Sequence, residues 1–186
     1  KYSFGGFSKG FKIYNNTLIM STDGASDPYY DFSIELWHTQ GGVEIYNNTM
    51  TGGLDFGGGI TMVCLVKGSY DYGAWVHNNT IGPTSMISNR TGIYLERNTE
   101  YAIIENNLIK NIYVGITVSP ASGETCQNHE IRYNIFNGVG YCALRYPVGS
   151  TGAIIKNINV YNNVFYGGTN DNLVGVGLYT AGTTTN

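Results

Sequence analysis

Residues 13–18 read Ile13-Tyr14-Asn15-Asn16-Thr17-Leu18, and five more versions of this stretch follow along the chain. The later versions begin at Ile45, Val76, Ile104, Ile131 and Val160. When they are aligned on the second asparagine, successive copies lie 27 to 32 residues apart. The six aligned asparagines are Asn16, Asn48, Asn79, Asn107, Asn134 and Asn163. Self-similarity at this period predicts a repeat architecture in which each copy is one structural unit.

The residues around each aligned asparagine alternate in character. The position three before it is always β-branched, and the position two after it is always apolar, as in Ile13 and Leu18. Alternation with a period of two predicts strands with one face turned inward. An asparagine between two such positions suits a sharp turn, since Asn tolerates left-handed backbone and its amide can bond to its copy in the next repeat. Each repeat is therefore predicted to be one coil of a β-solenoid.

A second strand pattern follows each asparagine turn after a loop. It is present in residues 32–37, 92–96, 115–118, 142–145 and 175–179. The combined pattern, V/I-x-I-x-x-N-x-I followed by G-I-x-V, resembles the right-handed parallel β-helix superfamily, the pectate-lyase-like fold. The resemblance covers residues 11–180 and implies an all-β, right-handed parallel β-helix of about six coils. Coil two departs from the pattern, because Leu54-Asp55-Phe56-Gly57-Gly58-Gly59 has too many glycines for an expected strand.

Length and composition restrict the possibilities further. The 186 residues are expected to form a single β-helix domain, 1–186, and the absence of an evident cap at either end favours an internal piece of a longer parent chain. With a net charge of -3 the chain lacks the excess positive charge that attracts phosphate groups, so nucleic acid is not an expected partner. No run of eighteen apolar residues is present, so we expect no membrane span.

Cysteines and acidic residues are the candidate redox and metal groups of this sequence. The three cysteines Cys64, Cys126 and Cys142 cannot build a disulfide framework. A pair between Cys126 and Cys142 is one alternative, and two buried free thiols are the favoured one. The loop residues Asp23, Asp27 and Asp31 form a candidate calcium site, although a solvated turn explains them more simply. We therefore expect no cofactor, with calcium as the one metal to consider.

Stacked coils turn the alignment into a map of the surface, because equivalent residues of adjacent coils lie about 4.8 Å apart. The strand before the asparagine carries an outward column of Tyr14, Tyr46, His77, Glu105, Arg132 and Tyr161. Structural ladders of stacked rings and surface ion pairs explain that face best. The strand after the loop carries Trp37, Tyr94, Glu96, Arg145 and Tyr179, and these five are the predicted sugar-binding residues. Flat rings beside hydrogen-bonding groups suit a polysaccharide, whose C–H faces stack on the rings.

Catalytic candidates are few. A lyase of the resembling superfamily needs a base beside a uronate carboxyl group, and Arg145 with Glu96 is the best-placed pair for such a role. The superfamily's hydrolases use clustered aspartates and a Gly-His-Gly stretch, which this sequence lacks. Glu35 and Glu96 are an alternative carboxylate pair, about 10 Å apart and at the upper edge for inverting hydrolysis. The three histidines His38, His77 and His129 are expected to be surface or loop residues rather than bases.

Three functions remain open from the sequence. The first is an extracellular or cell-surface β-helix segment that binds polysaccharide, in an adhesin or in the non-catalytic part of a carbohydrate-active protein. The second is a polysaccharide lyase or glycoside hydrolase, as the resemblance implies. The third is a purely structural stalk or surface solenoid, because the fold itself does not specify a function.

Overall fold

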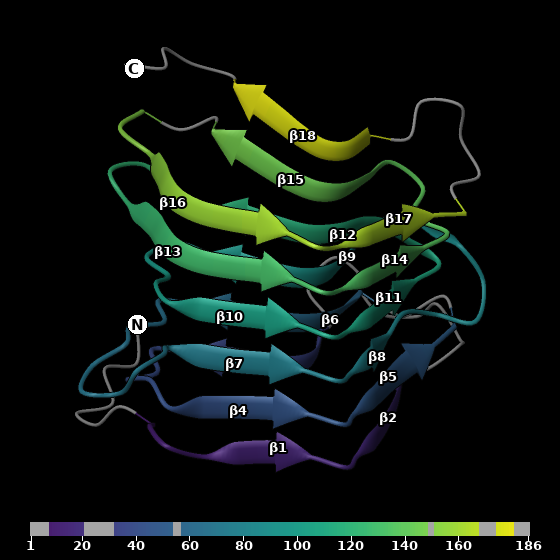
Figure 1. The fold of residues 1–186 in the computed structure, drawn as a ribbon, viewed down its shortest axis with the longest axis horizontal. Coiled ribbons are helices and arrows are strands. Elements are labelled where there is room, and N and C mark those ends of the chain that lie inside the picture. The colour runs from purple at the N-terminus through teal and green to yellow at the C-terminus, as the bar shows by residue number, and fades with distance from the viewer. Residues whose placement is uncertain (1–7, 21–31, 54–56, 149–150, 168–173, 181–186) are drawn as a thin grey trace.

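The computed structural model describes residues 8–20, 32–53, 57–148, 151–167 and 174–180. Within these ranges the regular elements are all β-strands, and they build three parallel six-stranded sheets (Figure 1). Sheet A contains β1 (Lys12–Tyr14), β4 (Val43–Tyr46), β7 (Ala74–His77), β10 (Ala102–Glu105), β13 (Thr125–Arg132) and β16 (Ile154–Tyr161). Sheet B contains β2 (Thr17–Met20), β5 (Thr49–Gly52), β8 (Thr80–Ile81), β11 (Leu108–Lys110), β14 (Ile135–Asn137) and β17 (Val164–Tyr166). Sheet C contains β3 (Phe32–Trp37), β6 (Gly58–Val63), β9 (Ile87–Glu96), β12 (Ile112–Ser119), β15 (Cys142–Val148) and β18 (Val174–Thr180).

Each coil contributes one strand to each sheet, in the order A, B, C. In Figure 1 sheet A runs from left to right at the front and sheet C returns behind it, while the chain climbs from β1 to β18. This sense of winding is right-handed. The predicted right-handed parallel β-helix of about six coils is therefore confirmed. Among the described residues no helix has the length and hydrophobicity needed to cross a bilayer.

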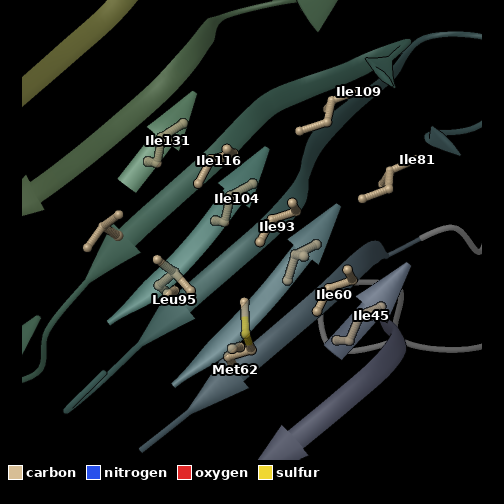
Figure 2. Packing of buried hydrophobic residues seen from close by; sticks show 14 of the residues in the cluster. Ile45, Ile60, Met62, Ile81, Ile93, Leu95, Ile104, Ile109, Ile116 and Ile131 are labelled. Carbon is tan, nitrogen blue, oxygen red and sulfur yellow. The ribbon is translucent and has the colours of Figure 1, made fainter. Parts of the chain in front are cut away.

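The register between coils follows the sequence alignment. Ile13 pairs with Ile45, Ile45 with Val76, and Val76 with Ile104 across sheet A. The inward side chains consequently form columns that run along the axis of the coil. Figure 2 shows isoleucines from the three sheets meeting in the interior. The labelled members include Ile45, Ile104 and Ile131 from sheet A, Ile81 and Ile109 from sheet B, and Ile60, Ile93 and Ile116 from sheet C, all fully buried. Burying each such side chain contributes about 1.5–3 kcal/mol to folding.

The aligned asparagines form a hydrogen-bonded ladder at the corner between sheets A and B. The backbone N–H and the Nδ2 of Asn48 both donate to Oδ1 of Asn79, each at 3.0 Å. Asn79 donates in the same way to Asn107. The predicted bonding between copies is confirmed. The left-handed backbone, however, belongs to the residue before, as at Asn47 with φ 54 and Asn78 with φ 55. The residue before the ladder asparagine makes the turn, and it is also an asparagine in every coil except the fifth, where Tyr133 has φ 56.

The glycine-rich part of coil two is a strand, so the prediction that residues 54–59 interrupt the pattern was wrong for Gly58 and Gly59, which open β6. A Cβ on Gly59 would lie 2.3 Å from Cγ2 of Ile81, and one on Gly92 would lie 2.9 Å from Cγ2 of Ile109. Glycine at these positions lets sheet B side chains pack directly on the sheet C backbone. The glycines therefore serve the close approach of two sheets. Residues 54–56 lie outside the described ranges.

Candidate functional site

The outer side of sheet C holds the predicted sugar-binding residues in two rows that run along the coil axis. The first row pairs Glu35 with Thr61, Thr61 with Tyr94, Tyr94 with Thr117, and Thr117 with Arg145. The second row pairs Trp37 with Val63, Val63 with Glu96, and Glu96 with Ser119. The structure thus places Glu35, Trp37, Tyr94, Glu96 and Arg145 on one face. In β18 the backbone of Tyr179 pairs with Pro147, and the side chain of Tyr179 lies outside the described part.

Trp37 is the large apolar side chain that this face offers to solvent. It ends β3, and 53% of its surface is exposed. The next residue, His38, has φ 53, and its ring centre lies 6.3 Å from that of the indole at an angle of 45°. In the next coil the small side chain of Val63 occupies the equivalent position and is buried. An exposed indole beside a small, buried neighbour forms a flat apolar platform.

The middle of the sheet C face is less exposed to solvent than the alternation of inward and outward residues predicts. Thr61 and Thr117 lie on the side opposite the inward Ile60 and Ile116, yet both are buried. Tyr94 lies between them, with its ring centre 6.4 Å from that of Phe32. Burial raises the pKa of the Tyr94 hydroxyl, and a hydrogen bond with Ser119 acts in the opposite direction. Tyr94 is therefore a neutral, half-buried group, two coils from the more open Trp37 and in the neighbouring row.

Two carboxylates border the face. Glu35 is exposed in the first coil, and Glu96 lies two coils further on, with β6 between them. Burial raises the pKa of the Glu96 carboxyl, while the positive charge of Arg97 lowers it. The Nε of Arg97 lies 4.0 Å from Oε1 of Glu96. Glu35 lies two residues before Trp37 on β3, and Glu96 lies two residues after Tyr94 on β9, so each ring has a carboxylate on its own strand.

Arg145 extends the same face two coils above Tyr94. It pairs in register with Thr117, and its side chain is half-buried. Its positive charge lowers the pKa of Tyr94, against the larger effect of burial. Beside it, burial raises the pKa of the Cys142 thiol to about 11. Arg145 therefore supplies a fixed positive charge beyond the acidic part of the face.

The predicted calcium site lies outside the described residues, whereas the cysteines lie within them. Asp23, Asp27 and Asp31 fall outside the described residues. Among the residues that are described, no group of three or more His, Cys, Asp or Glu side chains is arranged to hold a metal ion. All three cysteines are free, so the favoured interpretation of Cys126 and Cys142 as buried thiols is confirmed. Cys126 lies in sheet A and Cys142 in sheet C, which explains why they do not pair.

The outer face of sheet A is occupied by contacts among its own side chains. The rings of Tyr14 and Tyr46 stack at 4.9 Å, and those of Tyr46 and His77 stack at 5.0 Å, both pairs nearly parallel. Sequence reasoning missed the hydrogen bond from Nε1 of Trp75 to Glu105 (2.9 Å), because the two residues lie in different columns. Arg132 bonds to Glu105 and Glu130 at 2.6 Å each. These contacts support the structural interpretation of this face.

One histidine prediction was wrong. His129 is fully buried, not a surface or loop residue. The backbone N–H of Ala102 donates to its Nδ1 at 3.0 Å, so Nε2 carries the proton and donates to the hydroxyl of Thr99 at 3.3 Å. That hydroxyl donates to the sulfur of Cys126, whose thiol donates to the carbonyl of Arg97. The chain of polar groups is satisfied and inaccessible, so we assign it a structural role.

Three parallel sheets wound into one right-handed column define the class, a parallel β-helix protein whose outer sheet C face is the candidate site. The chain belongs to the family described as Protein of unknown function (DUF1565), whose family model matches residues 7–169. No curated protein and no solved structure matches the chain significantly. The family and the fold do not by themselves specify a function.

Proposed function

We propose that this chain is an extracellular or cell-surface β-helix segment that binds polysaccharide through the outer face of sheet C. Trp37 provides the stacking platform, and Tyr94, Glu96 and Arg145 provide polar and aromatic contacts along the coil axis. Tyr179 is included from its sequence position alone. The parent protein is proposed to be an adhesin or a carbohydrate-active protein, in which this segment is one part of a longer chain.

The observation that carries the proposal is the exposure of Trp37. More than half of its surface is exposed, and the next coil offers it the aliphatic Val63 in place of the stacked ring that Tyr14 has in Tyr46. An indole left in water is costly unless a ligand covers it, and the C–H face of a sugar is a suitable cover. Carboxylates that accept hydrogen bonds from hydroxyl groups lie on the same face, with Glu35 two residues before Trp37 on β3 and Glu96 two coils further along the row of Trp37.

Glycan retention tests the proposal directly. The chain is passed over immobilised insoluble and soluble polysaccharides, and Trp37→Ala is compared with the unchanged chain. We expect Trp37→Ala to weaken retention by about tenfold, because stacking on a ring contributes on the order of 1–2 kcal/mol. Tyr14→Ala is the matched control, since it removes a similarly exposed ring from sheet A. Equal retention of all three chains would contradict the assigned face, and no retention of any of them would favour a purely structural solenoid.

A second candidate, hydrolysis or elimination of the bound polysaccharide, is favoured by the raised pKa of Glu96. A carboxyl group that holds its proton to higher pH can act as a general acid, with Glu35 as its partner or with Arg145, two coils further along the face, as the charged group. Incubation with the retained polysaccharide, followed by assays for reducing ends and for the ultraviolet absorbance of unsaturated uronides, tests this candidate. We expect Glu96→Gln to abolish any product and to leave retention intact. Retention without product from the unchanged chain would restrict the function to binding.

A further inference from the structure

The outward side chains of sheet C alternate in size from one coil to the next. In the row that begins on β3, the coils contribute in turn Glu35, Thr61, Tyr94, Thr117, Arg145 and Gly177. The large side chains belong to coils one, three and five, and the small ones belong to coils two, four and six. The neighbouring row alternates in the same way over four coils, with Trp37, Val63, Glu96 and Ser119. The sheet C strands of coils two to five have neighbours on both edges, so the alternation does not depend on the ends of the column.

The small residues of the even coils offer little surface to a ligand. Thr61, Val63 and Thr117 are buried, although all three lie on the outer side of the sheet. Tyr94 is half-buried, and its hydroxyl bonds with Ser119, which ties the ring to coil four. The groups that a ligand can contact therefore recur at every second coil, which is twice the strand spacing or about 9.6 Å.

Each ring on this face is accompanied by a carboxylate. On β3 the indole of Trp37 lies two residues from Glu35. On β9 the ring of Tyr94 lies two residues from Glu96. A ring stacks on the C–H face of a sugar while a carboxylate accepts hydrogen bonds from its hydroxyl groups. Coil five adds the positive charge of Arg145, so a polymer with one sign of charge on every sugar would be repelled at part of the face, and an uncharged polymer would not.

We propose that the polysaccharide bound by sheet C is an uncharged, β-1,4-linked chain that lies along the coil axis with every second sugar on a large side chain. This inference rests on the proposed function and adds the linkage and the charge of the ligand. In an extended β-1,4-linked pyranose chain, each sugar is turned over relative to the one before it. The same face of a sugar therefore returns at every second unit, after a length close to that of two coils. Chains with β-1,3 or α-1,4 linkages do not present the same face at this interval.

The spacing of the large side chains sets how binding should depend on the length of an oligosaccharide, since one sugar covers about one coil. Two sugars can cover Trp37 or Tyr94 but cannot reach from one ring to the other. Three sugars span both rings, and five sugars extend two coils further to Arg145. Affinity should therefore rise about tenfold from two to three sugars because a second ring is engaged, and by a similar factor from four to five because a charged donor is added.

Calorimetric titration with β-1,4-linked oligomers of glucose, mannose and N-acetylglucosamine, each from two to six sugars long, tests the proposal. At least one series should show both steps in affinity, and added salt should leave its binding unchanged because the ligand is uncharged. Oligomers of β-1,3-linked glucose and of α-1,4-linked galacturonate should bind more weakly and without steps. If these bound as tightly as the β-1,4-linked series, or if no series showed the steps, the inference would be overturned while the proposed function stood. If no oligomer bound at all, the proposed function would fall and the inference with it.

Two substitutions tie the first step to this face. Tyr94→Ala and Trp37→Ala each remove one of the two rings, so each should abolish the rise in affinity from two to three sugars. Trp37 is exposed, so its substitution leaves the core unaltered and remains informative if Tyr94→Ala folds poorly. Tyr133→Ala is the matched control, because it removes an exposed ring at the corner between sheets A and B and should keep both steps. A first step of full size in both Trp37→Ala and Tyr94→Ala would overturn the inference. An uncharged ligand also has no uronate group, so hydrolysis is then the reaction that remains for the second candidate function.

Discussion

Oδ1 of Asn79 accepts two hydrogen bonds from Asn48, one from the backbone N–H and one from Nδ2, both at 3.0 Å. Asn79 itself donates through Nδ2 to the carbonyls of Ile45 and His77 and to Asn107. One buried side chain therefore joins three consecutive coils. The stability of the column depends on this repeated connection.

Asn79→Ala is expected to lower the free energy of unfolding by about 2–4 kcal/mol. The change removes an acceptor and a donor from a buried site, and each unsatisfied buried partner costs about 1–3 kcal/mol. Urea unfolding followed by circular dichroism measures the effect. Asn16→Ala is the matched control, since Asn16 occupies the same position in the exposed first coil and should lose less. Equal losses at the two positions would contradict the role of burial.

Stability should fall with acid because of His129. Burial lowers the pKa of His129 from 6.5 to about 3, so the folded chain keeps the imidazole neutral while the unfolded chain protonates it. The stability contributed by the neutral ring is present above pH 6.5 and is lost as pH falls from 6.5 toward 3. The expected slope from this group is about 1.4 kcal/mol per pH unit.

Urea unfolding between pH 7 and pH 4 measures that slope. His129→Asn keeps a hydrogen-bond acceptor near the N–H of Ala102 and removes the titrating ring, so it should flatten the pH dependence. His38→Asn replaces an exposed imidazole and should preserve the slope of the unchanged chain. An unaltered slope in His129→Asn would show that other groups cause the acid sensitivity.

Gly92→Ala should destabilise the chain by about 1–3 kcal/mol. The new methyl group would lie 2.6 Å from the carbonyl oxygen of Gly115 and 2.9 Å from Cγ2 of Ile109, and backbone this closely packed cannot move aside cheaply. Gly175→Ala is the control, because a Cβ there meets nothing within 4 Å. Thermal melting of the two variants compares them directly. If Gly92→Ala melted at the same temperature as the unchanged chain, sheets B and C would be able to separate enough to admit the methyl group.

Much of the site could be placed from the sequence because coil stacking makes neighbours predictable. The column containing Trp37 and Glu96 follows from alignment alone, whereas the place of Arg145 in the column of Tyr94 and Thr117 is seen only in the assembled sheet. The strand of coil two was not expected because Gly58 and Gly59 have low strand propensity. The space that Gly59 leaves for Ile81 is visible only when the sheets are assembled. The contact of Trp75 with Glu105 was missed for a related reason, since it crosses between columns.

The order of the coils, their stacking and the asparagine ladder can be predicted from the sequence. They depend on the alternation of apolar and polar residues and on asparagines repeated at a nearly constant interval. The tertiary structure alone decided which outward residues stay open. Thr61 and Trp37 both face away from the core, yet one is buried and the other is exposed. Burial of that kind depends on how side chains from several coils and sheets cover one another, and no local pattern contains that information.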